Sequence, residues 1–170
     1  MFDTPILQSI NWVSTLVRLL LAVLLSGILG IERGKKNRPA GFRTYVVVCI
    51  GSTLAMMTNQ YIFEKMGGSD PTRIAAQVIS GIGFLGAGTI ILTGQNQVKG
   101  LTTDAGLWAA ACLGLAVGCG YYEGAILGCL SLFAAMHLMH SLDVYLLSKS
   151  KVMTVYIEVS KSSDISRFLE

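Results

Sequence analysis

Two histidines and an aspartate near the end of the chain have a spacing that could suit a metal ion. His137, His140 and Asp143 recur every three residues, which places them on one side of a helix. Two imidazoles and a carboxylate are ligands that a divalent metal accepts. The alternative is a polar stripe that packs against a neighbouring helix or lipid headgroups. Because no second set of ligands accompanies these residues, we favour packing and predict no metal site.

Arg18 is an ionisable residue inside the first apolar run of the sequence. It lies about 12 Å from the outer end of that run at 1.5 Å per residue. An unpaired charge at that depth costs about 3 kcal/mol or more. Two explanations stay open, since the guanidinium could snorkel past Trp12 to the outer surface or could form a functional ion pair.

Asp104 is a second ionisable residue at a predicted membrane boundary. The N-terminal dipole of a helix stabilises a carboxylate in its first turn, so a capping role is one interpretation. The other is a network of charges, because Asp104 is expected on the same side of the membrane as Glu32, Arg33 and Arg43. Such a network would line a vestibule that opens to the cytoplasm.

We also predict that charges hold the helix ends in register. An inner cluster would contain Glu32, Arg33 and Arg43, and an outer cluster would contain Asp70 and Arg73. A partly buried cation that loses its acidic partner cannot recover its hydration, so breaking either cluster should destabilise the fold.

A glycine-rich block, GIGFLGAG, contains Gly81, Gly83, Gly86 and Gly88 and has the formal pattern GxGxxG. That pattern binds dinucleotides only where it follows a strand, and no strand precedes it here. Glycines in an apolar helix instead let two backbones approach closely, so we predict helix packing at all four positions. The spacing recurs in Gly114 with Gly118 and Gly124 with Gly128.

The elements that carry these residues are predicted to be transmembrane helices. Of the 170 residues, 52% are hydrophobic and 14% charged, and the mean hydropathy is +0.60, whereas soluble domains have about a quarter charged residues. The apolar runs predict five spans, at residues 10–31, 45–62, 72–92, 103–122 and 124–147. They leave no room for a separate enzyme domain, so we predict no enzyme and no cofactor. A net charge of +3 is too small to indicate nucleic-acid binding.

The positive residues predict the orientation. Ten of the thirteen Lys and Arg residues fall in residues 32–43, 93–103 and the tail after residue 147. Positive loops stay in the cytoplasm, which places the N-terminus outside and the C-terminus inside. In residues 152–159 apolar and polar residues alternate, which predicts a strand. Residues 151–170 therefore look like the start of an incomplete cytoplasmic α+β domain, after a transmembrane domain at 1–150.

Three blocks of the sequence carry a family resemblance: GIERGKKNRPAGFRT, DPTRIAAQVISGIGFLGAGTII and VKGLTTDAGLWAAACLGLAVGCGYY. Together they resemble the MgtC/SapB family of bacterial inner-membrane proteins, over the stretch from Arg18 to Tyr122. The family motifs fall on Glu32, Arg33, Ala40, Gly41, Arg43, Thr44, Asp70, Pro71, Arg73, Ala75, Ala76, Gln77 and the four glycines of the block. Asp104 departs from the family, which often has Ala at that position.

The resemblance implies a five-helix membrane domain followed by a small cytoplasmic domain of the ACT type. It also implies a non-enzymatic regulator that supports growth at low magnesium or under envelope stress and, in pathogens, survival inside macrophages. Such a regulator would bind other membrane proteins, with the ATP synthase as one partner, and the glycine-rich faces suggest a homodimer. The rival interpretation is a transporter or channel for magnesium or another ion. The candidates for ligand or partner binding are Arg18, Glu32, Arg33, Arg43, Asp70, Arg73, Gln77 and Asp104.

Overall fold

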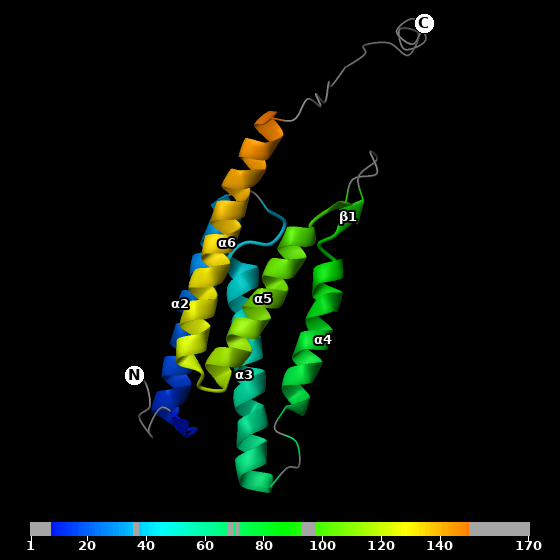
Figure 1. Ribbon diagram of the computed structural model, residues 1–170. Coiled ribbons are helices and arrows are strands. Elements are labelled where there is room, and N and C mark those ends of the chain that lie inside the picture. The colour runs from blue at the N-terminus through cyan, green and yellow to red at the C-terminus, as the bar shows by residue number, and fades with distance from the viewer. Residues whose placement is uncertain (1–7, 36–37, 68–69, 71, 93–97, 150–170) are drawn as a thin grey trace, which may run out of the picture. The chain divides into compact units, whose positions relative to one another are not determined.

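The computed structural model describes residues 8–35, 38–67, 70, 72–92 and 98–149 (Figure 1). The chain divides into two compact units, residues 1–136 and residues 137–170. We describe the first unit by itself, and of the second only the helical residues 137–149. The predicted strand at 152–159, and with it the ACT-type domain, lies outside the described residues.

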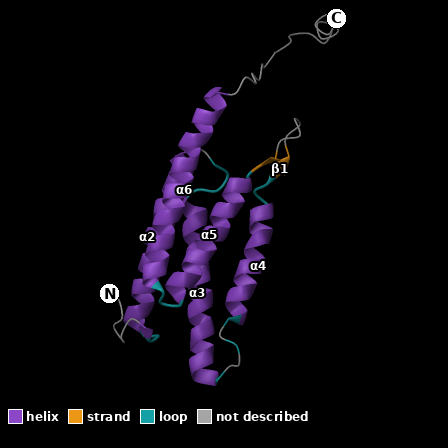
Figure 2. Cartoon of the chain, in the orientation of Figure 1, coloured by secondary structure: helices purple, strands orange, loops and turns teal. Residues whose placement is uncertain are grey.

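Five helices account for most of the described residues: α2 (Trp12–Lys35), α3 (Phe42–Met66), α4 (Arg73–Ala87), α5 (Leu101–Gly118) and α6 (Tyr122–Lys149). A two-residue strand, β1 (Ile91–Leu92), pairs antiparallel with β2 (Val98–Lys99) between α4 and α5 (Figure 2). The helical class of the predicted membrane domain is confirmed, whereas the short hairpin was not predicted.

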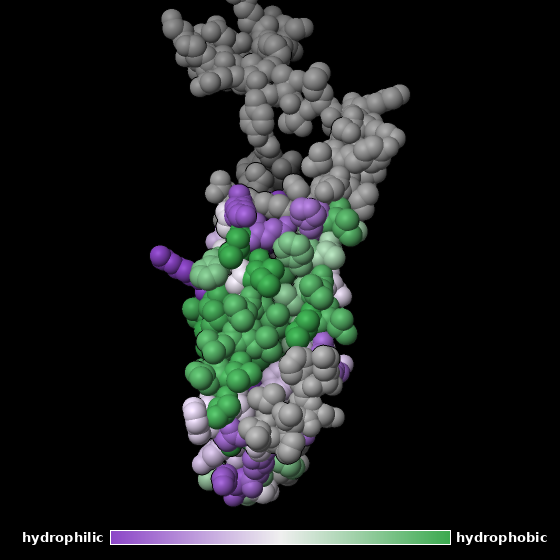
Figure 3. Space-filling view, turned by 90° about the vertical axis from the view of Figure 1, so that its left-hand side faces the viewer, coloured by the Kyte–Doolittle hydropathy of each residue, from purple (hydrophilic) through white to green (hydrophobic). Residues whose placement is uncertain are grey.

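Among the described residues, four helices have the length and composition to cross a membrane, namely α2, α3, α5 and the Tyr122–Met139 part of α6. One face of the molecule is apolar across its middle and hydrophilic at both ends (Figure 3). Helix α2 exposes a row of large apolar side chains at intervals of three or four residues: Leu16, Leu20, Leu24, Ile28 and Ile31. Lipid chains suit such a surface, so the chain is a multi-pass membrane protein.

Helix α4 is shorter than the predicted span at 72–92. It has 15 residues, about 22 Å at 1.5 Å per residue, whereas the hydrocarbon core of a bilayer is about 30 Å thick. Glycines explain the early end, because they favour leaving a helix. After Gly86 the amides of Thr89 and Ile90 donate to carbonyls only three residues back, and the chain then enters β1.

Helices α5 and α3 pack closely through small residues. Gly106, Ala110, Gly114 and Gly118 are buried at intervals of four residues on α5. A Cβ on Gly118 would lie 2.7 Å from the Thr53 carbonyl oxygen, and one on Gly114 would overlap the backbone of α3. The close packing predicted at Gly114 and Gly118 is therefore confirmed, with α3 as the neighbour.

The glycine block of α4 behaves differently from the prediction. Only Gly86 is buried, and a Cβ there would overlap the carboxylate of Asp104 on α5. Gly81 and Gly83 are exposed, and no atom of the described residues lies within 4 Å of the place where their Cβ would be. Gly88 approaches only carbonyls of its own helix. Packing inside the chain was thus predicted wrongly for Gly81 and Gly83. Gly81 is five residues before Gly86 and faces away from α5, whereas Gly83 is close to the face of Gly86 but has no described neighbour within 4 Å.

Candidate functional site

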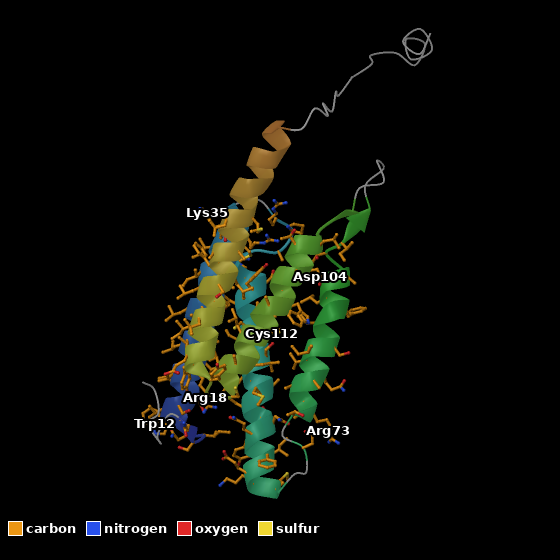
Figure 4. All side chains as sticks on the ribbon, in the orientation of Figure 1. Trp12, Arg18, Lys35, Arg73, Asp104 and Cys112 are labelled. Carbon is orange, nitrogen blue, oxygen red and sulfur yellow. The ribbon has the colours of Figure 1, made fainter. Side chains whose placement is uncertain are left out.

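Helix α2 carries two buried arginines, one toward each of its ends. Arg18 is 0% exposed and Arg33 is 5% exposed. Their separation along the axis is about 22 Å at 1.5 Å per residue. Arg18 lies at the end of the unit where α5 turns into α6, whereas Lys35 marks the opposite end of α2 (Figure 4). We call the surroundings of these residues the Arg18 cluster and the Arg33 cluster.

The Arg18 cluster is held by hydrogen bonds from the guanidinium to four oxygens. Nη1 donates to the Gly118 carbonyl at 2.7 Å and to Oε1 of Gln60 at 2.9 Å. Nε donates to the Tyr122 hydroxyl at 3.1 Å, and Nη2 donates to the Gln8 carbonyl at 3.1 Å. These four acceptors are uncharged and come from three other parts of the chain. The snorkelling explanation is wrong, because the guanidinium turns inward.

This arrangement satisfies the end of α5. The last carbonyls of a helix have no partner inside the helix, and a cation near them is favoured by the dipole. Arg18 donates to Gly118, and the amide of Gln60 donates to the Cys119 carbonyl at 3.2 Å. The turn continues through Gly120, whose φ is +84° and whose Cβ would lie 3.3 Å from Nη2 of Arg18. Glycine is needed there for both reasons.

The Arg33 cluster joins the end of α2 to the start of α3 and the start of α5. Nη2 of Arg33 donates to Oγ1 of Thr103 at 3.1 Å. Tyr45 is fully buried, its hydroxyl lies against Gly106, and its nearest charged groups are Arg33 and Glu32. Nε of Arg33, the Tyr45 hydroxyl and Oε2 of Glu32 are all buried at this place. A cation and a carboxylate therefore both act on the buried tyrosine hydroxyl.

The predicted inner cluster is correct in part. Arg33 is buried and Glu32 is half-buried, but Arg43 is exposed and makes no ion pair with any described residue. Arg43 is the second residue of α3 and is exposed, although its neighbour Phe42 packs closely against Gly30 of α2. Tyr45 and Thr103 accompany Arg33 where Arg43 was expected, and the sequence did not predict either of them.

Asp104 was predicted either to cap α5 or to join the charge network of Glu32, Arg33 and Arg43, and it does neither in full. It is half-buried in the first turn of α5, but the N-cap is Gly100 and has no side-chain hydrogen bond. The carboxylate lies against Gly86 of α4, which explains why Gly86 has no side chain. Asp104 therefore links α5 to α4 and is not part of the Arg33 cluster.

The predicted outer cluster is replaced by a local turn. Oδ1 of Asp70 accepts hydrogen bonds from the amide of Thr72 at 2.8 Å and from its hydroxyl at 2.7 Å. These bonds lower the pKa of the Asp70 carboxyl, and the charge of Arg73 contributes least. Arg73 and Gln77 are exposed on α4, and Arg73 lies at the opposite end of α4 from Asp104 of α5 (Figure 4). A short Asx turn satisfies Asp70 without any ion pair.

No group of three or more His, Cys, Asp or Glu residues in the part of the chain that the structure describes could hold a metal ion. The side chains of His140 and Asp143 lie outside the described residues, so the packing interpretation of that stripe stays a prediction.

With the geometry described, comparison with known proteins identifies the family. The sequence model of the MgtC family matches residues 19–145. The chain belongs to the MgtC family. The match includes the whole Arg33 cluster and begins one residue after Arg18. No solved structure matches the chain.

Several relatives support membership in the MgtC family. The chain is 40% identical over 140 residues to the putative magnesium transporter YhiD of Escherichia coli K12, covering 79% of this chain and 65% of the relative. It is 42% identical over 115 residues to protein SapB of Bacillus subtilis, covering 65% and 50%. It is 40% identical over 121 residues to protein MgtC of Brucella abortus, covering 71% and 49%. The chain thus spans about half to two thirds of the length of these relatives.

Proposed function

We propose that this MgtC family member is a non-enzymatic regulator in the bacterial inner membrane that acts by binding other membrane proteins. The observation that carries the proposal is the separation of the two polar clusters. Between them the interior is largely apolar, with Ala22, Leu25 and Leu29 of α2 packed against α3 and α5. The described residues of this unit therefore offer no continuous polar path from one end to the other, which a hydrated ion would need.

The hydroxyl groups in this interior do not form a polar path for a magnesium ion. Ser52 donates to the Val48 carbonyl at 2.9 Å, and Thr53 donates to the Cys49 carbonyl at 2.8 Å and to the Gly114 carbonyl at 3.0 Å. Hydroxyls that donate to carbonyls of α3 and α5 stabilise the helix pair. Magnesium prefers six oxygen ligands in octahedral geometry and holds its water tightly, so these few hydroxyls would serve it poorly.

The surface that we assign to partners is the uncovered side of α4. Arg73, Gln77, Gly81 and Phe84 recur at intervals of three or four residues and are exposed, Phe84 by 89%. In lipid, the Gln77 amide would lack hydrogen-bond partners, whereas a facing helix could supply them. Gly81 leaves room for the backbone of that helix. We propose that a second copy of the chain, or another membrane protein such as the ATP synthase, docks here.

The second candidate function is an ion transporter, which the name of the YhiD relative favours. Purified protein in sealed vesicles separates the two functions. We expect magnesium uptake to equal that of empty vesicles. Uptake that rises with the amount of protein, and that falls when the apolar interior is altered by Leu25→Asp, would refute the regulator.

Docking is tested in cells that depend on the protein for growth in low magnesium. We expect Gln77→Leu and Gly81→Leu to abolish this growth at normal membrane abundance, and to remove crosslinks made through Phe84→Cys. Leu24→Ala, on the exposed side of α2, is the matched control and should behave as wild type. Normal growth of all the folded variants would exclude this surface.

The orientation and the cytoplasmic domain also remain proposals. We propose that the Arg33 end faces the cytoplasm, that the N-terminus lies outside, and that residues 151–170 begin an α+β domain of the ACT type. A membrane-impermeant reagent should label Arg38→Cys only after the membrane is opened. Labelling of Arg38→Cys in intact cells would reverse the orientation.

A further inference from the structure

The depth of Gln77 in the membrane follows from the contacts of α4 with α5. Gly86 lies against Asp104 in the first turn of α5, at the end of the unit that holds the Arg33 cluster. Gln77 is nine residues before Gly86, about 14 Å toward the opposite end at 1.5 Å per residue. Arg33 lies about 32 Å along α2 from Trp12, which is 80% exposed and suited to a membrane interface. Gln77 therefore lies near the middle of a hydrocarbon core that is about 30 Å thick.

An exposed amide at this depth needs a polar neighbour. Gln77 is exposed on the uncovered side of α4, and so are Ser80 and Gly81. Acyl chains offer no hydrogen bonds, so an amide that faces them is strongly unfavourable. The carbonyl oxygen of a glutamine side chain accepts hydrogen bonds and its NH2 group donates them. The group that covers Gln77 must therefore offer both a donor and an acceptor at the middle of the membrane.

Helix α4 is also recessed at the end of the unit that holds the Arg18 cluster. Arg73 is 13 residues from Gly86 along α4, about 20 Å, and Gly118 is 14 residues from Asp104 along α5, about 21 Å. Helix α4 therefore begins level with the Arg18 cluster, to which Gly118 belongs. Helix α3 continues for six residues beyond Gln60 of that cluster, about 9 Å further (Figure 1).

The recess favours a partner of the same shape. A helix that is shorter than the hydrocarbon core either thins the bilayer around it or is covered by oligomerisation. A partner helix of ordinary length, about 20 residues, would extend past the start of α4. A second copy of the chain brings an α4 with the same 15 residues and the same recess, so the two short helices match along their whole length.

We propose that a second copy of the chain covers α4, with the two α4 helices parallel and related by a two-fold axis along the membrane normal. This axis places Gln77 of both copies at the same depth, where each amide donates to the carbonyl oxygen of the other. Gly81, one turn along, lets the two backbones approach closely. The inference rests on the proposed function, because it names the partner of the surface assigned there.

Charges at the start of the two helices complement each other in this arrangement. Asp70 and Arg73 are both exposed in each copy. Two-fold symmetry brings Arg73 of one copy toward Asp70 of the other, and the same contact is repeated across the axis. The two negative charges offset the repulsion between the two arginines, which lie at the same depth.

The first test measures the dimer of the full chain in lipid vesicles, by energy transfer between labelled copies over a range of protein-to-lipid ratios. We expect energy transfer that saturates as the protein-to-lipid ratio rises. Gln77→Leu should raise the dissociation constant about 5- to 30-fold, as for loss of hydrogen bonds between membrane helices. Gly81→Leu should abolish the dimer, because a side chain there separates the backbones.

Gly51→Leu is the matched control for Gly81→Leu. Gly51 is also an exposed helical glycine, on α3, and no atom of the described residues lies within 4 Å of the place where its Cβ would be. Its variant should keep the wild-type dissociation constant. A chain that stays monomeric at every protein-to-lipid ratio would overturn the dimer, and so would equal losses in Gly51→Leu and Gly81→Leu.

The second test examines the symmetry by disulfide crosslinking in membranes, in a chain that carries Cys112→Ala and Cys119→Ala. A single Ser80→Cys should form a disulfide with its own counterpart, because a two-fold axis beside α4 brings the same residue of both copies together. Leu24→Cys, on the exposed side of α2, should stay uncrosslinked. Equal crosslinking of the two variants would overturn the proposed axis.

Growth in low magnesium, measured with the same variants, reports separately on the proposed function. If the chain is monomeric and Gln77→Leu still abolishes growth, the surface binds another membrane protein and the dimer is overturned. If Gln77→Leu weakens the dimer and growth stays normal, the dimer stands and the proposed function of this surface is refuted.

Discussion

The strongest prediction concerns Arg18, the fully buried arginine that caps α5. We consider Arg18→Met, which keeps an unbranched apolar stem but removes the guanidinium and with it four hydrogen bonds. The substitution also removes a buried charge, so a simple sum of four bond energies would overestimate the effect.

The magnitude follows from the groups that lose their donor. The Gly118 carbonyl is buried at the end of a helix, and leaving such an acceptor unsatisfied costs about 1–3 kcal/mol. The Tyr122 hydroxyl and the Gln60 amide lose one partner each, for about 0.5–1.5 kcal/mol apiece. Together these losses lead us to expect that Arg18→Met lowers the free energy of unfolding by roughly 2–6 kcal/mol.

The assay is reversible unfolding in mixed micelles, with exposed Arg43→Met as the control that should change stability by less than about 0.5 kcal/mol. Tyr122→Phe removes the acceptor of the 3.1 Å bond from Nε. Its effect should be about 1 kcal/mol in wild type and smaller after Arg18→Met. If Arg18→Met is as mild as Arg43→Met, or if the two effects at Arg18 and Tyr122 simply add, the capping role of Arg18 is refuted.

Three further perturbations test the packing and the loop. Gly114→Leu should prevent α5 from packing on α3 and lower the unfolding midpoint strongly, whereas Gly83→Leu should leave the midpoint of a monomer in detergent unchanged. Gly86→Ala should destabilise the protein through contact with the Asp104 carboxylate, and Asp104→Ala in the same chain should recover most of that loss, as read from the same unfolding curves. The pKa of Asp70 is lowered in the folded protein. The ionised carboxyl therefore stabilises the fold above the unfolded pKa of about 3.9, and this stabilisation disappears as the pH falls further. The unfolding free energies of wild type and Asp70→Asn should converge in acid, and a difference that grows in acid would contradict the turn.

Much of the fold could be predicted from local pattern. The apolar runs predicted the five helices, and the sequence blocks around Glu32, Asp70 and Gly100 predicted the family. Helix ends were less predictable, as α4 shows, because a glycine-rich run is compatible both with continuing a helix and with ending it.

The polar clusters could be predicted only in part, because their members are far apart in the sequence. Arg18 and Tyr122 are 104 residues apart, and Arg33 and Thr103 are 70 apart. Local spacing identifies Arg18 and Arg33 as charges that need partners. It does not say that a tyrosine hydroxyl and a helix carbonyl are among the partners of Arg18.

The ion pairs predicted at the helix ends were wrong for a related reason. Glu32 and Arg43 were paired because they are close in sequence, but the loop between α2 and α3 allows Arg43 to project outward, where it is exposed. Asp70 and Arg73 are also close in sequence, but Asp70 instead accepts hydrogen bonds from the hydroxyl and the amide of Thr72. Proximity in sequence is a weak guide to ion pairs where neutral donors compete for the same oxygen.

The two arginines of α2 also set a length. Fifteen residues separate Arg18 from Arg33, and fifteen separate Gly118 from Thr103, the residues that they bind on the antiparallel helix α5. The two hydrogen-bonded contacts are therefore spaced equally along α2 and along α5. Deleting one residue of α2 between Arg18 and Arg33 would shift one contact by about 1.5 Å and turn it by about 100° about the helix axis. Helix α5 therefore cannot slide along α2 by a turn without breaking both hydrogen bonds, so any large movement in this membrane unit must come from the other helices.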